Sequence, residues 1–272
     1  MLVVSLPPEP SALVGVLVAG WLYGRGVRRL WRQAGRGHVV RGWQVACFGG
    51  GLAALLLALE SPLDGLSEQL FAVHMVQHLL LILAAAPLLV LGAPLAPMLW
   101  ALPAASRRAV GGWWRRLTGP ARPSVAFVLH SLALWAWHLP PLYEAALGSR
   151  GVHVLEHTSF VLTAALFWWS LLHRGRAGYG VSVLYVFGLA LESTLLGALL
   201  TFAHGPWYTS HLATTAAWGL SPLEDQQLAG LIMWVPGGAL YLAAGLLLAG
   251  LWLGSGRKHG FAAVTPAQEA MS

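Results

Sequence analysis

The sequence is poor in cysteine and in charge, and both shortages restrict what the protein can be. Cys47 is the single cysteine in 272 residues, so neither an internal disulfide nor a paired-cysteine metal site can form within the chain. Only 10% of the residues are charged and 57% are hydrophobic, whereas charged residues make up about a quarter of a typical soluble domain. This composition excludes an ordinary soluble domain and predicts an integral membrane protein.

Long apolar runs are abundant in the sequence. A helix needs about 20 apolar residues to cross the hydrocarbon core of a bilayer, and seven runs approach or exceed this length. We therefore predict an all-α, polytopic protein with one transmembrane domain over residues 1–256 and a disordered cytoplasmic tail over residues 257–272. The predicted spans are residues 11–31, 43–59, 69–91, 124–140, 152–172, 181–203 and 228–253.

The basic residues indicate how these spans lie in the membrane. In a seven-span arrangement, every lysine and arginine except Arg150 falls on one side. Because positively charged loops stay in the cytoplasm, we expect the N-terminus outside and the C-terminus inside. The net charge of +6 follows from these loops and does not indicate nucleic-acid binding. No Lys or Arg precedes the first span, so we expect that span to be retained and not cleaved as a signal peptide.

Two histidine pairs with the spacing H-x-x-x-H lie at the outward ends of predicted spans. They are His74 and His78 in HMVQH, and His153 and His157 in HVLEH. A spacing of four places both imidazoles of a pair on one helix face, and the two pairs lie at matched depth. Imidazole is the commonest protein ligand for metals, and ionisable groups are costly inside a membrane. The pairs therefore predict a shared metal site near the outer interface.

Three further residues are candidate ligands for the same ion. They are His138, Asp225 and Met233, because imidazole, carboxylate and thioether groups all bind metals. Asp225 has a second interpretation, since Ser221 and Glu224 have the spacing of a helix capping box. An acidic residue in the first turn of that helix would also stabilise the helix dipole.

Four polar residues are expected to support the site without binding its ion. Glu156 is adjacent to His157, and successive residues point about 100° apart on a helix, which favours a supporting role. Gln226 opens the last predicted span. Glu192 and His130 lie in the middle of two predicted spans, where a mutual interhelical hydrogen bond would satisfy both side chains.

Proline interrupts two of the predicted spans that carry these candidates. Pro87 lies in the third span, and Pro236 precedes two glycines in the seventh. Proline removes a helical hydrogen bond and clashes with the preceding turn. Both helices should therefore be kinked or loosened at these points.

Four long motifs follow one another between about residues 70 and 253. They read HMVQHLLLILAAAPLLVLGAP, WHLPPLYEAAL, HVLEHTSFVLTAALFWW and SPLEDQQLAGLIMWVPGG. In this order they resemble the motifs of the polytopic CtaG family of cytochrome c oxidase assembly factors, a family distinct from the single-span copper-delivery protein of the same name. The resemblance implies a multi-pass protein of the bacterial inner membrane that helps a haem-copper oxidase to mature, through its copper.

The resemblance also carries over to individual residues. It places candidate site residues in all four motifs, which in chain order contribute His74 and His78, then His138, then His153 and His157, and finally Asp225, Gln226 and Met233. The partners that it implies are cytochrome c oxidase subunits, membrane lipid and an extracytoplasmic copper donor.

Four functions remain open on the sequence. The first, which we favour, is a non-enzymatic assembly factor that holds copper in an outward-facing site and passes it to oxidase subunits. The second is a membrane hydrolase in which a zinc ion bound by His and Asp activates water. The third is a haem-binding redox protein. The fourth is a scaffold without metal, whose histidines serve packing and pH sensing.

Overall fold

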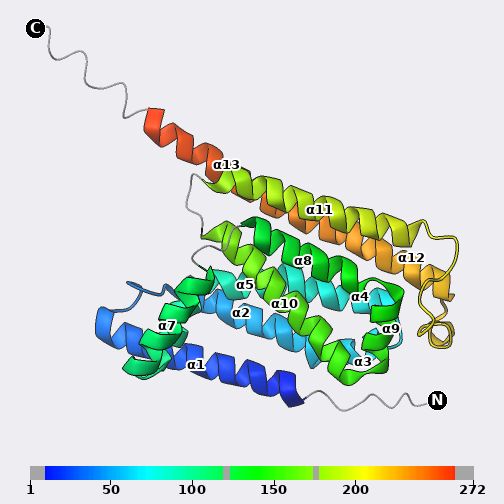
Figure 1. The fold of residues 1–272 in the computed structure, drawn as a ribbon, viewed down its shortest axis with the longest axis horizontal. Coiled ribbons are helices and arrows are strands. Elements are labelled where there is room, and N and C mark those ends of the chain that lie inside the picture. Colours follow the sequence, from blue (N-terminus) through cyan, green and yellow to red (C-terminus); the bar gives the residue numbers. More distant parts are fainter. Residues whose placement is uncertain (1–9, 119–122, 174–177, 261–272) are drawn as a thin grey trace, which may run out of the picture.

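Helices account for nearly all of the regular structure. The structure, a computed structural model, describes residues 10–118, 123–173 and 178–260. No strand occurs among these residues. The long helices run side by side and form an elongated bundle (Figure 1). The all-α prediction is therefore confirmed.

Each of the seven predicted spans coincides with helical structure. The third and seventh spans are each divided into an α-helix, a short π-helical segment and a second α-helix. The helices at these positions are α1 (Pro10–Ala34), α2 (Gly42–Leu59), α4 (Phe71–Leu79) with η1 (Leu80–Ala85) and α5 (Ala86–Leu91), α8 (Pro123–Trp137), α10 (Arg150–Leu172), α11 (Tyr179–Thr201), and α12 (Pro222–Ile232) with η4 (Met233–Gly237) and α13 (Gly238–Gly260).

Four of these helical segments are long and apolar enough to cross a membrane. They are α2, α4 to α5, α11, and α12 to α13. A fifth is possible if α8 and α9 (Pro140–Gly148), which are bent by 75° relative to each other, form one broken span. The described structure thus has four or five candidate membrane-spanning helices. Residues 261–272, most of the predicted tail, lie outside the described part of the chain.

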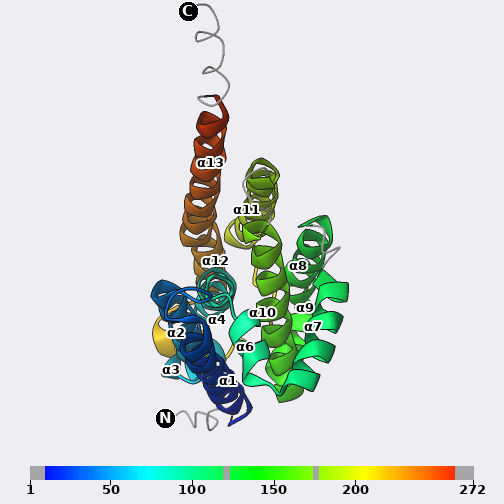
Figure 2. The ribbon, with the colours of Figure 1, turned by 90° about the vertical axis from the view of Figure 1, so that its left-hand side faces the viewer.

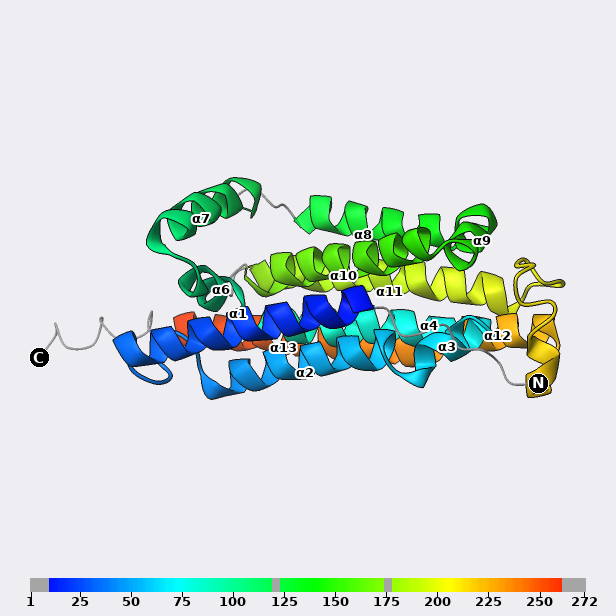
Figure 3. The ribbon, with the colours of Figure 1, turned by 90° about the horizontal axis from the view of Figure 1, so that it is seen from below.

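Short helices cover the two ends of the bundle. At one end lie α3 (Pro62–Ser67), α9 and the connection over residues 203–221, which includes the turn η3 (Thr215–Trp218). At the opposite end lie α6 (Leu95–Ala101) and α7 (Ala104–Thr118) (Figure 3). Viewed along the bundle, α10 passes close to α8 and α11, and α4 lies beside α12 (Figure 2). None of these short elements was predicted, because each is shorter than a membrane span.

A π-helical segment lies at or just before both predicted proline sites. The segment η1 ends two residues before Pro87, and η4 contains Pro236. A proline has no N–H to donate to the preceding turn, and a π-helical widening is one way in which a helix accommodates such an interruption. The predicted loosening is therefore observed as a change of helix type within two long segments.

Two glycines allow α12 to approach α11 closely. A Cβ atom added to Gly230 of α12 would lie 2.5 Å from the carbonyl oxygen of Gly197 in α11 and 2.5 Å from Oγ1 of Thr201. Only a residue without a side chain fits this crossing. Because α12 also packs against α4, the crossing helps to fix the beginning of α4, where one histidine pair lies.

We expect Gly230→Ala to destabilise the protein by about 1–3 kcal/mol, since overpacking of a tight contact forces the backbone to move. Thermal unfolding in detergent would measure the loss. Gly250→Ala in α13 is the matched control, because no side chain and no atom of another helix lies within 4 Å of the Cβ position there. Equal unfolding temperatures for the two variants would contradict the assigned role of Gly230.

Candidate metal centre

The two predicted histidine pairs face each other from α4 and α10. The ring centroid of His157 lies 5.9 Å from that of His74 and 5.5 Å from that of His78. The ring of His153 lies 5.7 Å from that of His74. The i, i+4 spacing keeps each pair on one face of its helix, so the packing of the bundle brings all four imidazoles together.

A carboxylate completes a group of four potential ligands. His74, His78, Glu156 and His157 each contribute one ligand atom, and these atoms all lie within 4.8 Å of one another. Oε1 of Glu156 is 3.7 Å from Nε2 of His74 and 3.5 Å from Nε2 of His78. Glu156 was expected to play a supporting role, but the structure places its carboxylate between the two histidines of α4.

The ligand atoms of this group have no hydrogen-bond partners among the described residues. Both ring nitrogens of His74 and His78, both carboxylate oxygens of Glu156 and Nε2 of His157 are buried and make no hydrogen bond to a described residue. Buried polar groups in native proteins are normally hydrogen-bonded, and leaving them unpaired is costly. Imidazole nitrogens and carboxylate oxygens are ligands for zinc, and imidazole also suits copper. The donor set therefore fits a first-row transition metal.

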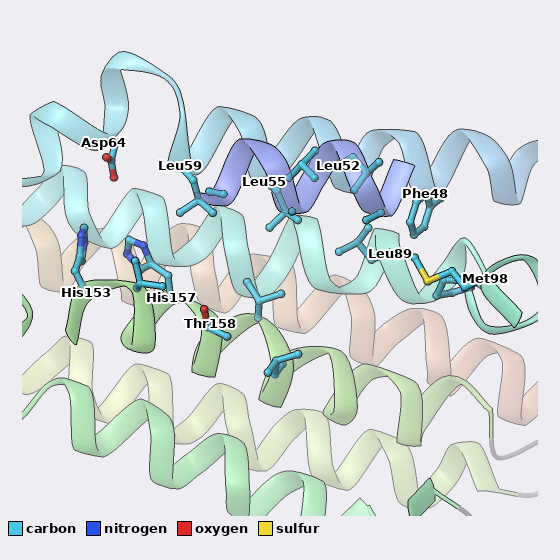
Figure 4. Close-up of a pocket in the computed structure, with 18 residues that line it drawn as sticks. Phe48, Leu52, Leu55, Leu59, Asp64, Leu89, Met98, His153, His157 and Thr158 are labelled. Atoms are coloured by element: carbon cyan, nitrogen blue, oxygen red, sulfur yellow. The ribbon is translucent and has the colours of Figure 1, made fainter. Parts of the chain in front are cut away.

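One side of the group opens onto an apolar groove between α1, α2 and α10. The groove has a volume of about 430 Å³. His153 and His157 project from α10 at one end of it, near Asp64, whereas Phe48 and Met98 lie at the other end (Figure 4). His153 is thus next to the four-residue group without belonging to it.

The other side of the group is closed by aromatic residues and by residues 203–221. The ring of Tyr143 lies 5.1 Å from that of His74, and its hydroxyl is 2.7 Å from Nε2 of His211. Burial lowers the pKa of His211, which favours the neutral ring in this hydrogen bond. Glu144 accepts hydrogen bonds from the backbone and side chains of Thr209 and Ser210, and so holds the connection against α9.

Asp225, in the first turn of α12, lies against the beginning of α4 and does not belong to the four-residue group. Its two carboxylate oxygens accept hydrogen bonds from the backbone N–H groups of Phe71 (2.7 Å) and Ala72 (3.0 Å). These N–H groups belong to the first turn of α4 and have no partner within that helix. A carboxylate here also stabilises the positive end of the helix dipole. Asp225 thus positions the helix that carries His74 and His78.

The capping box predicted for α12 is present. The hydroxyl of Ser221 accepts a hydrogen bond from the backbone N–H of Glu224, and the Glu224 carboxylate accepts from the backbone N–H of Ser221. Gln226, one residue after Asp225, accepts a hydrogen bond from the backbone N–H of Trp207 (2.6 Å). It therefore attaches residues 203–221 to α12.

The remaining predicted residues lie at varying distances from the group. His138 lies beside it, with its ring centroid 6.1 Å from that of His78. Met233 is buried in the hydrophobic core at the start of η4. His130 bonds to Oγ1 of Thr163 at 2.9 Å, and no hydrogen bond joins it to Glu192 among the described residues.

Sequence reasoning did not assign a role to Gln77, which lies between the two histidines of α4. Its amide nitrogen donates hydrogen bonds to the carbonyl oxygen of Ala58 (2.8 Å) and to Oδ1 of Asp64 (2.7 Å). It therefore joins α4 to α2 and α3. Its position in HMVQH, one residue before His78, places it on a different helix face from the two histidines. This position could have indicated a contact with another helix.

Taken together, the fold and the site define a multi-pass helical membrane protein with a buried His/Glu cluster near one end. The sequence profile of the cytochrome c oxidase caa3 assembly factor family matches residues 21–255. The chain belongs to this family, and the resemblance seen in its four motifs is confirmed.

Two curated mycobacterial proteins are similar to the chain. They are the uncharacterized protein Mb0105 of Mycobacterium bovis and the uncharacterized protein MT0111 of Mycobacterium tuberculosis, each 28% identical over 203 residues. Each similarity covers 64% of this chain but 31% of the relative, so the chain spans about a third of the length of these proteins. No solved structure matches the chain.

We expect Asp225→Asn to destabilise the protein by about 1–3 kcal/mol, because an amide leaves one of two buried N–H groups without an acceptor. Chemical or thermal unfolding of the purified protein would measure this. Glu224→Gln, at the exposed capping box one residue earlier, should cost less. If Glu224→Gln were the more damaging change, Asp225 would not have the positioning role assigned to it.

Proposed function

We propose that the protein is a copper-binding assembly factor for a haem-copper cytochrome c oxidase. It holds copper at His74, His78, Glu156 and His157 and delivers it to oxidase subunits. The observation that carries this proposal is the set of buried ligand atoms without hydrogen bonds that these four residues contribute. A bound cation would pair with one ligand atom of each residue and would offset part of the cost of their burial.

Family membership supports copper as the ion. The family assembles a cytochrome c oxidase, and oxidases of this type contain copper centres that must be supplied during maturation. Three imidazoles and one carboxylate suit copper, although they also suit zinc. When bound, copper would be the cargo of the protein, so its ligands must be exchangeable.

We also propose the seven-span topology in a bacterial inner membrane, with the N-terminus outside. The bundle supports this arrangement. Residues 35–41 and α7, which together carry six of the sixteen basic residues, lie at the end opposite to α3, α9 and residues 203–221 (Figure 3). Of the basic residues used to orient the chain, Arg122, Arg174 and Arg176 lie outside the described residues. Positive loops face the cytoplasm, which puts the metal centre near the extracytoplasmic face.

The orientation can be tested by cysteine labelling of intact cells in a Cys47→Ser background. His38→Cys and Ser149→Cys both introduce an exposed thiol, at opposite ends of the bundle. We expect a membrane-impermeant maleimide to label Ser149→Cys in intact cells and His38→Cys only after lysis. The reverse pattern would place the metal centre on the cytoplasmic side and would contradict delivery on the outer face.

The metal centre can be tested with Glu156→Gln and with the double variant His78→Ala/His157→Ala. Purified wild type should contain about one copper ion per chain after copper loading, as expected for four ligands around one ion. Both variants should lose it, because they remove the anionic ligand or two of the imidazoles. In a strain that lacks the gene, the same variants should fail to restore cytochrome c oxidase activity.

His204→Ala is the control, because this histidine is exposed and lies outside the four-residue group. It should keep both the metal and the oxidase activity. Zinc at one per chain would favour the hydrolase, and a haem absorption band would favour the redox protein. Wild type that binds no metal after loading would overturn the copper site and leave a scaffold.

A further inference from the structure

Met75 and His138 form an unusual buried contact beside the four-residue group. Sδ of Met75 on α4 lies 3.4 Å from Nε2 of His138, the residue that follows the last turn of α8. Both side chains are almost completely buried. A thioether sulfur has no hydrogen to donate, so the character of this contact depends on whether Nε2 carries a proton.

The hydrogen bond of the other ring nitrogen of His138, Nδ1, determines whether Nε2 carries a proton. Nδ1 lies 2.7 Å from the carbonyl oxygen of Leu134, which can only accept a hydrogen bond, so Nδ1 carries the proton. A neutral imidazole has one N–H, and Nε2 therefore presents a lone pair. The lone pairs of Nε2 and of the Met75 sulfur face the same space, and neither side chain can donate a hydrogen bond to the other.

We propose that Met75 and His138 are a ligand pair for copper(I), adjacent to the His/Glu cluster. A thioether is a soft ligand that selects copper(I), whereas imidazole binds both copper and zinc. The pair carries no negative charge, which suits a monovalent ion better than a divalent one. The inference deepens the proposed function and rests on it, because a copper carrier needs a feature that distinguishes copper from zinc.

His78 is the residue that joins the two groups of ligands. Its ring lies 6.1 Å from that of His138, and both of its ring nitrogens are buried without a hydrogen-bond partner among the described residues. One nitrogen, Nε2, faces Glu156. His78 can therefore serve as the third ligand of a copper(I) ion held by Met75 and His138, or as a ligand in the His/Glu cluster.

The pair can be tested on full-length protein in detergent with two ions. Zinc(II) probes the His/Glu cluster, and copper(I), supplied without oxygen under reducing conditions, probes the thioether pair. We expect Met75→Leu to weaken copper(I) binding by at least the roughly tenfold that loss of an outer-shell partner costs, because it removes a direct ligand, and to leave zinc(II) binding unchanged. Met98→Leu is the matched control, since Met98 lines the groove and not this contact, and it should change neither affinity.

X-ray absorption of the copper(I)-loaded wild type gives a second measurement that does not depend on any variant folding. Sulfur in the copper coordination shell would support the pair, and a shell of nitrogen and oxygen alone would overturn it. Zinc(II) binding with no sulfur at copper(I) would leave the cluster intact and reject this inference only. Copper(I) bound through sulfur without zinc(II) binding would reject the cluster only, and binding of neither ion would reject both.

Discussion

The burial of polar side-chain atoms without hydrogen bonds is the constraint on which the rest of the structure depends. Seven nitrogen and oxygen atoms of His74, His78, Glu156 and His157 are buried with no hydrogen bond among the described residues. Buried polar groups that lack hydrogen bonds are costly in an apolar helical bundle, and a half-satisfied polar cluster is less stable than an apolar core. A cation would compensate part of this burial, as proposed above, and the surrounding fold holds the four side chains in place without one.

The helix that does most to position the cluster is α12, although α12 contributes no residue to the cluster itself. Asp225 of α12 caps the first turn of α4, and the glycine contact with α11 sets how closely α12 can pack. Gln77 joins α4 to α2 and α3 from within the histidine motif itself. The positions of His74 and His78 are thus determined by interactions with residues far away in the chain, which act on the helix backbone.

Periodicity predicted the helices and the meeting of the histidine pairs, because a spacing of four defines a helix face whatever the neighbours are. Periodicity did not predict interactions between residues that are far apart in the sequence. The role of Asp225 depends on backbone groups more than 150 residues away, which no local pattern reveals. Glu156 was expected to point away from the histidines because it is adjacent to His157. It also lies three residues after His153, however, and residues with an i, i+3 spacing share a helix face. The short helices α3 and α9 were not predicted, because the sequence was divided by apolar runs long enough to span a membrane.

The two sides of the metal centre are closed to different degrees, and this asymmetry bears on how an ion could be exchanged. On one side Phe71, Tyr143 and His211 are packed together and buried. Hydrogen bonds to Glu144 and Gln226 hold residues 203–221 in place on this side. On the other side His153 and His157 border the groove, whose remaining lining is mostly apolar. Opening the first side would break several hydrogen bonds, whereas an approach along the groove breaks none of them. Under the proposed function, a partner that receives the ion would therefore reach His157 more readily from α1 and α2 than from the end of the bundle.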